Sequence, residues 1–182
     1  MKKIVLTFGL ISGAISSLMM STTILFADRI GVHHSYFLGY TIIVLSFLLV
    51  FFGIRSYRDE AGNGQITFTR AFMVGIAITL ISCVCYVVTW EILYFNFLPD
   101  FWTKYSAETV EKMQAAGATS AAVAAKAEEM KKFKQSYDKV LVNSAMTFLE
   151  PFPVGLVITL ISAAILRKKP RAQAGPTPQP AS

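Results

Sequence analysis

The stretch FMVGIAITLIS at residues 72–82 recurs eighty positions later as FPVGLVITLIS at residues 152–162, with eight of the eleven positions identical. Both copies place Gly, Thr and Ser at positions i, i+4 and i+7, and on a helix this spacing puts them on one narrow face. In lipid, small side chains let two helix backbones approach closely, so the pattern predicts helix packing. The residues are Gly75, Thr79 and Ser82 in one copy and Gly155, Thr159 and Ser162 in the other.

Two other apolar segments carry a similar face. Gly9, Gly13 and Ser16 reproduce it fully, while Gly39 and Ser46 keep only its ends. We therefore expect four helices to meet through small residues. The repeat itself has two interpretations, an internal duplication or a chance match between segments that draw on few residue types. A duplicated pair would cross the membrane in opposite directions, as inverted repeats of transporters do.

The composition is that of a membrane protein, with 54% hydrophobic residues and a mean hydropathy of +0.52. The apolar residues form four blocks, each near the roughly 20 residues that span a bilayer core as a helix. The sequence predicts an all-α membrane protein with four transmembrane helices. The predicted spans are about 4–27, 36–54, 71–97 and 145–166, within a membrane domain 1–169 that includes an outer helical insertion at 98–144, followed by a disordered cytoplasmic tail at 170–182.

The net charge of +6 does not indicate nucleic-acid binding, because the cations lie beside the apolar blocks rather than along one soluble face. In a four-span topology, nine cations of the short segments and termini fall on one side and only Arg29 on the other. The positive-inside rule then places both termini in the cytoplasm. The long insertion complicates this count because it carries seven lysines.

The insertion carries an amphipathic pattern after a break expected at Gly117, with Ser120 as a candidate N-cap. This helix of residues 120–144 could lie on the membrane surface, on a short partner at 106–116, or on another subunit. We expect the lipid bilayer as one partner, and a protein partner or a second copy through the small-residue faces or this helix. Its apolar positions are Val123, Ala127, Met130, Phe133, Tyr137, Val140 and Ser144.

The last span contains the sequence Glu150-Pro151-Phe152-Pro153. A proline cannot continue a helix without a kink, and it disfavours helical geometry at the residue before it. We therefore expect a break or bend here, with Glu150 in an extended conformation.

No nucleotide-binding, metalloprotease, nucleophile-elbow or paired CxxC motif is present, so the sequence predicts no catalytic residue, no cofactor and no metal, and does not indicate an enzyme. His33 and His34 are interpreted as a solvated loop pair, although neighbours in a loop could share a metal. Cys83 and Cys85 lie two apart within an apolar run and cannot bridge one another on a helix.

Glu91 and Glu150 are the one group of residues that we consider as a candidate functional site. Counted from the cytoplasmic arginines, they lie about 31 and 25 Å along their helices, near the outer boundary of the membrane. Acids at this depth suggest an ion or proton site, with His33 or His34 as additional ligands. The alternative is that they are interfacial acids, or partners of Arg29 and Lys104.

Four segments together resemble a known family. They are GIRSYRD at 53–59, GQITFTRAF at 64–72, LPDF at 98–101 and GLVITLISAAILRKK at 155–169. In order and spacing the chain, apart from its tail, is similar to the uncharacterised four-helix integral membrane proteins of Bacteroidota called domain of unknown function 4199. The resemblance implies four spans and a bacterial inner-membrane location, and it brings no activity or substrate.

These inferences favour a structural or interaction component of the inner membrane. The alternative is a small transporter or ion-coupled subunit that uses Glu91 and Glu150. A transporter requires both carboxylates to face one wet cavity, whereas an interaction protein requires an uncovered small-residue stripe or an uncovered apolar face on residues 120–144.

Overall fold

The computed structural model describes the backbone of residues 1–25 and 32–168, and the side chains of these residues except 25, 32–40 and 42. Within these ranges every secondary-structure element longer than an isolated bridge is a helix, which confirms the prediction of an all-α protein. The helices are α1 (Lys2–Leu25), α3 (Val32–Ala61), α4 (Phe68–Phe97), α5 (Phe101–Ala115), α6 (Ser120–Tyr137), α7 (Val140–Leu149) and α8 (Pro151–Leu166).

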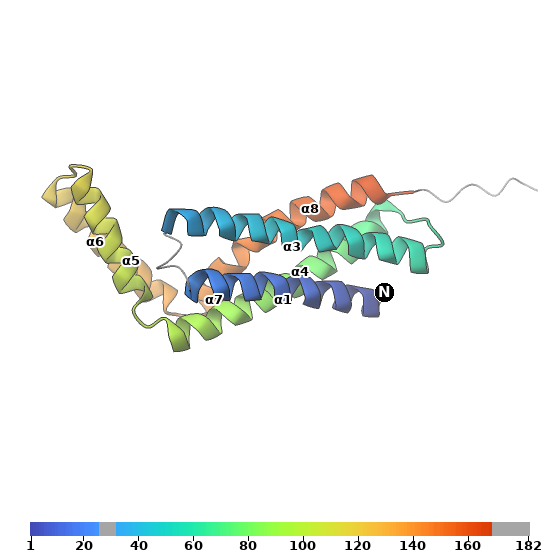
Figure 1. Ribbon diagram of the computed structural model, residues 1–182, viewed down its shortest axis with the longest axis horizontal. Helices are drawn as coiled ribbons and strands as arrows, with labels where there is room; N and C mark the ends of the chain where they lie inside the picture. Colours follow the sequence, from blue (N-terminus) through green and yellow to red (C-terminus); the bar gives the residue numbers. More distant parts are fainter. Residues whose placement is uncertain (26–31, 169–182) are drawn as a thin grey trace, which may run out of the picture.

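Helices α1, α3, α4 and α8 form a bundle in which α1 and α8 each pack against both α3 and α4 (Figure 1). The start of α1, the α3–α4 turn and the end of α8 lie at one end of the bundle. A pair of backbone hydrogen bonds between Ile66 and Lys168, 2.8 and 3.2 Å long, ties the α3–α4 turn to the end of α8. Helices α5 and α6 lie at the opposite end.

Three stretches of the described residues are long and apolar enough to cross a membrane: Lys2–Ile24, Phe68–Phe97 and Val140–Leu166. They correspond to the first, third and fourth predicted spans. The second predicted span, 36–54, falls in α3, whose early side chains lie outside the described residues, so it stays a prediction. Large apolar side chains point away from the bundle on all three stretches, among them Leu18, Val84 and Ile165, each more than half exposed. Such a surface matches lipid better than water.

The α7–α8 junction corrects one expectation. Helix α7 ends at Leu149 and α8 begins at Pro151, so the expected break in the helix is present. Glu150 between them has helical φ and ψ of −70° and −59°, so the expected extended geometry is wrong. Pro151 occupies the first position of α8, where its missing N–H breaks no necessary hydrogen bond. Helical geometry therefore persists on both sides of the interruption, as in proline-kinked helices.

The predicted continuous helix 120–144 is also wrong, because α6 ends at Tyr137 and α7 begins at Val140. Asp138 closes α6 through its backbone N–H, and Lys139 has an extended ψ of 116°. The N-cap is Thr119 rather than Ser120, since the Thr119 hydroxyl accepts a hydrogen bond from the Ala122 N–H. The break at Gly117 is present, with a left-handed φ of +77°, and α5 is the neighbour on which α6 packs.

Candidate functional site

The two repeated segments meet where α4 crosses α8. The hydroxyls of Thr79 and Thr159 are 3.0 Å apart and both residues are fully buried. Each threonine methyl faces a glycine of the other helix: a Cβ on Gly75 would lie 2.7 Å from Thr159 Cγ2, and one on Gly155 would lie 2.5 Å from Thr79 Cγ2. The contact is reciprocal, so the repeated Gly-x-x-x-Thr spacing builds a nearly two-fold symmetric crossing of antiparallel helices.

The small residues of α1 lie against α4 and α3. A Cβ on Gly9 would lie 2.8 Å from Ile81, and one on Gly13 would lie 2.6 Å from Cys85. The Ser82 hydroxyl donates to the Gly9 carbonyl at 3.3 Å. Such close approaches require glycine, because an added methyl group would displace the neighbouring helix.

Serines complete the contact of α1 with α3. The Ser12 hydroxyl donates to the Ser46 carbonyl at 2.9 Å, while the Ser16 hydroxyl donates to carbonyls of its own helix. Ser162, the last residue of the face on α8, is buried at 3% exposure. The surroundings of Gly39 lie outside the described residues. The other ten predicted packing residues are buried within this chain, so they leave no uncovered small-residue stripe for another protein.

Glu91 and Glu150 both face the contact of α4 with α7, but each accepts a hydrogen bond from a different residue. Ser144 donates to Glu91 at 2.6 Å, and Tyr86 donates to Glu150 at 3.2 Å. Tyr86 precedes Glu91 by five residues, so the two hydrogen bonds lie at levels separated by about 7.5 Å along α4. The structure therefore brings both carboxylates to one helix interface, where each accepts its hydrogen bond from a different hydroxyl.

The ion or proton site at these two acids stays a prediction. None of the ion pairs among the described residues includes Glu91, Glu150 or Lys104. The same part of the chain holds no cluster of three or more metal-binding side chains. Arg29 and the side chains of His33 and His34 lie outside the described residues. The two-carboxylate transporter hypothesis gains no support from these contacts.

Sequence reasoning missed two buried polar residues of α7. Asn143 and Thr147 are buried, and the Thr147 hydroxyl donates to the Asn143 side-chain oxygen at 3.2 Å. Their i, i+4 spacing inside the apolar run VLVNSAMTFL was the available signal of a buried face. The Asn143 side-chain nitrogen and one Glu91 oxygen are buried with no hydrogen-bond partner among the described residues.

A layer of aromatic rings joins the end of α4 to α5 and α6. Trp90 stacks on Tyr94 at 5.8 Å, and Tyr94 lies edge-on to Tyr137 at 5.4 Å. Phe101, Trp102, Tyr105 and Phe133 continue the layer across the hairpin. This mixture of tryptophan and tyrosine at the end of an apolar helix is typical of a membrane–water boundary.

Asp138 fixes the turn from α6 to α7 to this layer. It accepts hydrogen bonds from the Tyr94 hydroxyl and the Lys134 ammonium, both at 2.5 Å. Burial acts to raise the pKa of Asp138, but these two hydrogen bonds outweigh it and hold the pKa below its ordinary value. Burial, together with the nearby carboxylates of Glu150 and Glu91, raises the pKa of Tyr137. The hairpin is thus attached to the bundle by polar as well as aromatic contacts.

A groove of about 410 Å³ runs between α5 and α6. Its floor is mostly apolar, and Lys131 and Lys134 contribute the cationic part of its wall. Neither Glu91 nor Glu150 lines it. The remaining lining residues are Trp102, Thr103, Ser106, Ala107, Ala127 and Met130.

The amino-acid sequence of this chain matches a known family. A family model described as a protein of unknown function, DUF4199, matches residues 7–168. The chain belongs to the DUF4199 family. The match extends from α1 to the end of α8, so it includes both the glycine–threonine crossing and the α5–α6 hairpin. The DUF4199 description assigns no activity. Comparison with curated proteins and with solved structures finds no match.

Proposed function

We propose that this DUF4199 protein is a four-span protein of the bacterial inner (cytoplasmic) membrane that serves as a structural or interaction component, with the α5–α6 hairpin as its interaction surface. Three apolar stretches of the described residues support the membrane location. Helix α3 is the fourth span in this proposal, because it packs beside α1, α4 and α8 and is itself 30 residues long.

The distribution of charge supports an orientation with both termini in the cytoplasm. The cations of the described short segments all lie at the end of the bundle that holds the start of α1, the α3–α4 turn and the end of α8. Cytoplasmic segments of membrane proteins carry such an excess of lysine and arginine. The hairpin then lies on the opposite, extracytoplasmic side.

The observation that carries the interaction role is the contrast between the buried small-residue faces and the hairpin. The described glycine and hydroxyl faces are buried in contacts between helices of the bundle, whereas α5 and α6 extend from its end (Figure 1). In the hairpin, α5 contains no buried residue and α6 contains one, Met130. A helix pair with so little internal core has most of its surface available to a partner.

Cysteine accessibility tests the orientation. In a variant with Cys83 and Cys85 replaced by alanine, Ser120→Cys reports on the hairpin and Ser56→Cys on the opposite end. A membrane-impermeant maleimide should label Ser120→Cys in intact spheroplasts and Ser56→Cys only after the membrane is permeabilised. Labelling with the opposite preference would refute the proposed orientation.

Photo-crosslinking tests the interaction role. A photoreactive amino acid at Lys131, which is exposed on α6, should give discrete protein adducts in native membranes. The matched control is Val84, which is exposed on the apolar surface of α4 and should give lipid adducts instead. Equal yields of protein adducts from both positions, or protein adducts from neither, would contradict a partner-binding hairpin.

A further inference from the structure

Cationic side chains of α1, α3 and α4, and of the two residues that follow α8, gather at one end of the bundle. Seven of them lie among the described residues, and they share this end with two acids, Asp59 and Glu60. The seven are Lys2, Lys3, Arg55, Arg58, Arg70, Arg167 and Lys168. Such an excess of positive charge creates a local potential that attracts anions.

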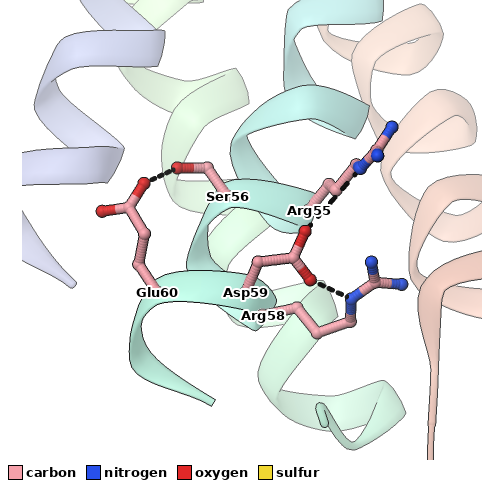
Figure 2. Close-up of polar contacts among 5 residues, drawn as sticks. All are labelled: Arg55, Ser56, Arg58, Asp59 and Glu60. Carbon is pink, nitrogen blue, oxygen red and sulfur yellow. Dashed lines mark hydrogen bonds and ion pairs between the residues drawn. The ribbon is translucent and has the colours of Figure 1, made fainter. Parts of the chain in front are cut away.

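The two acids are already engaged by neighbours on α3. Figure 2 shows Asp59 between Arg58, at 2.8 Å, and Arg55, at 3.7 Å, while Glu60 accepts a hydrogen bond from Ser56. The hydrogen bond from Arg58 holds the pKa of Asp59 below its ordinary value, so this carboxylate stays charged and keeps both arginines partly neutralised. In contrast, no ion pair among the described residues includes Arg70, Arg167 or Lys168.

Arg70 is held in place by a tyrosine of the neighbouring helix. Its Nε donates to the Tyr57 hydroxyl at 3.0 Å, and its guanidinium carbon lies 5.8 Å from the centre of the Tyr57 ring. Tyr57 is itself buried, with 7% exposure, while Arg70 is exposed. With Nε engaged, the planar fork of the two Nη groups remains as the donor set suited to a phosphate.

The end of α8 is brought to the same place. Lys168 pairs through its backbone with Ile66, which lies four residues before Arg70 in the segment that leads into α4. Arg167 and Lys168 are both exposed. The three cations therefore stand on two segments that hydrogen bonds hold side by side.

Exposed apolar side chains lie on α4, which carries Arg70, and on α8, which Arg167 and Lys168 follow. Phe68 and Met73 on α4 are 39% and 56% exposed, and Ile161 and Ile165 on α8 are 53% and 66% exposed. A soluble anion or a nucleic acid needs only the cationic part of this surface. A molecule with an anionic head and apolar chains matches both parts.

We propose that Arg70, Arg167 and Lys168 form a binding site for the headgroup of an anionic phospholipid, with its acyl chains along the exposed apolar side chains of α4 and α8. Basic pockets between transmembrane helices on the cytoplasmic side recognise lipid phosphates in this way. The inference rests on the proposed membrane location and orientation, which place this end at the inner leaflet.

Lipid binding to the purified full-length protein in a neutral detergent tests the proposal. Native mass spectrometry would compare phosphatidylglycerol, phosphatidylcholine and glycerol phosphate, the last as a headgroup without acyl chains. Phosphatidylglycerol should bind saturably and at least 10-fold more tightly than the other two. Equal binding of phosphatidylcholine, or equal binding of glycerol phosphate, would overturn the proposal. Because the detergent has no sidedness, this result is independent of the maleimide test of orientation.

Two variants locate the site. Arg70→Gln should weaken phosphatidylglycerol binding about 10-fold or more, because it removes charge-assisted hydrogen bonds. Tyr57→Phe keeps the ring and removes only the hydroxyl that orients Arg70, so the expected loss is roughly 2- to 5-fold. Lys104→Gln, an exposed cation of α5, is the charge-matched control and should change nothing. Unchanged binding in Arg70→Gln with an unchanged circular dichroism spectrum, or an equal loss in the control, would also overturn the site.

Discussion

The replacement of Gly155 by alanine tests whether glycine sets the distance between α4 and α8. The added Cβ would lie 2.5 Å from Thr79 Cγ2, whereas ordinary contact begins at 3.4 Å, so the shortfall is about 0.9 Å. The same Cβ would lie 2.9 Å from two ring carbons of Phe47 on α3. The methyl group thus meets two different helices, and relief from one contact brings no relief from the other.

The expected cost follows from this geometry. Overpacking a close-packed interior typically costs about 1–3 kcal/mol. A shift that separates the helices would also lengthen the 3.0 Å hydrogen bond between Thr79 and Thr159. Interhelical hydrogen bonds in membrane proteins contribute about 0.6 kcal/mol on average. We therefore expect Gly155→Ala to lower the free energy of unfolding by roughly 2–3 kcal/mol.

The assay is reversible unfolding in mixed micelles with increasing sodium dodecyl sulfate, followed by circular dichroism. Ala164→Val is the matched control, because Ala164 is exposed on the same helix and its replacement also enlarges a small side chain. The control should change the unfolding free energy by less than about 0.5 kcal/mol. Equal stability of Gly155→Ala and the unaltered protein would show that glycine does not set the spacing.

A second-site variant identifies the atom responsible. Thr79→Ser removes the methyl group that faces Gly155 but keeps the hydroxyl that bonds Thr159. In the double variant, Thr79→Ser should restore about half of the stability lost in Gly155→Ala, since Phe47 still obstructs the new methyl group. If the changes in unfolding free energy of the two single variants simply add in the double variant, the Thr79 methyl group is not the atom that the new Cβ displaces.

Three further predictions address the crossing, the hairpin and its attachment. In a double-mutant cycle, Thr79→Val and Thr159→Val should couple by about 0.6–1.7 kcal/mol because their hydroxyls bond each other, and a coupling near zero would contradict that bond. Gly117→Ala should destabilise the hairpin by about 1 kcal/mol in thermal unfolding, because the φ of Gly117, +77°, is left-handed and costs an alanine free energy. The added Cβ would meet no atom within 4 Å, so this cost is one of backbone conformation alone. Equal stability would argue against the left-handed conformation. Because the pKa of Asp138 is depressed in the folded protein, its charge stabilises the folded state at pH values above the ordinary pKa of 3.8, and this contribution is lost as the pH falls through the folded-state pKa. The difference in stability between the unaltered protein and Asp138→Asn should therefore shrink from pH 7 to pH 3. A constant difference would refute the role of the Asp138 charge.

The sequence predicted the helices of the bundle well because lipid imposes a simple requirement on them. A helix that crosses a bilayer needs an uninterrupted apolar stretch of defined length, and this property is readable without knowledge of any neighbour. The spacing of Gly75, Thr79, Gly155 and Thr159 likewise follows from helix geometry alone. What it could not give is the partner of each face, because a stripe of small residues fits any other stripe.

The errors fall where two local preferences compete with a tertiary contact. The pattern from Val123 to Ser144 continues through Asp138 without a break, yet α6 ends at Tyr137, where Asp138 accepts a hydrogen bond from the Tyr94 hydroxyl of α4. At Glu150 the preference for extended geometry before proline loses to the packing of α7 and α8 along α4. Both decisions depend on residues more than forty positions away, which no local pattern contains.

The same reasoning applies to Glu91 and Glu150, whose hydrogen-bond partners the sequence did not predict. Depth along a helix estimates only one coordinate, and the sequence predicted a similar depth for both acids. Their partners, Ser144 and Tyr86, are set by the register of α7 against α4, and that register gives each acid a separate hydroxyl. A shared function for two carboxylates requires that both face one site, which depth alone cannot establish. In a bundle held by small faces, the chemistry of the polar residues therefore follows from helix register, and register is the quantity that the glycine–threonine crossing fixes.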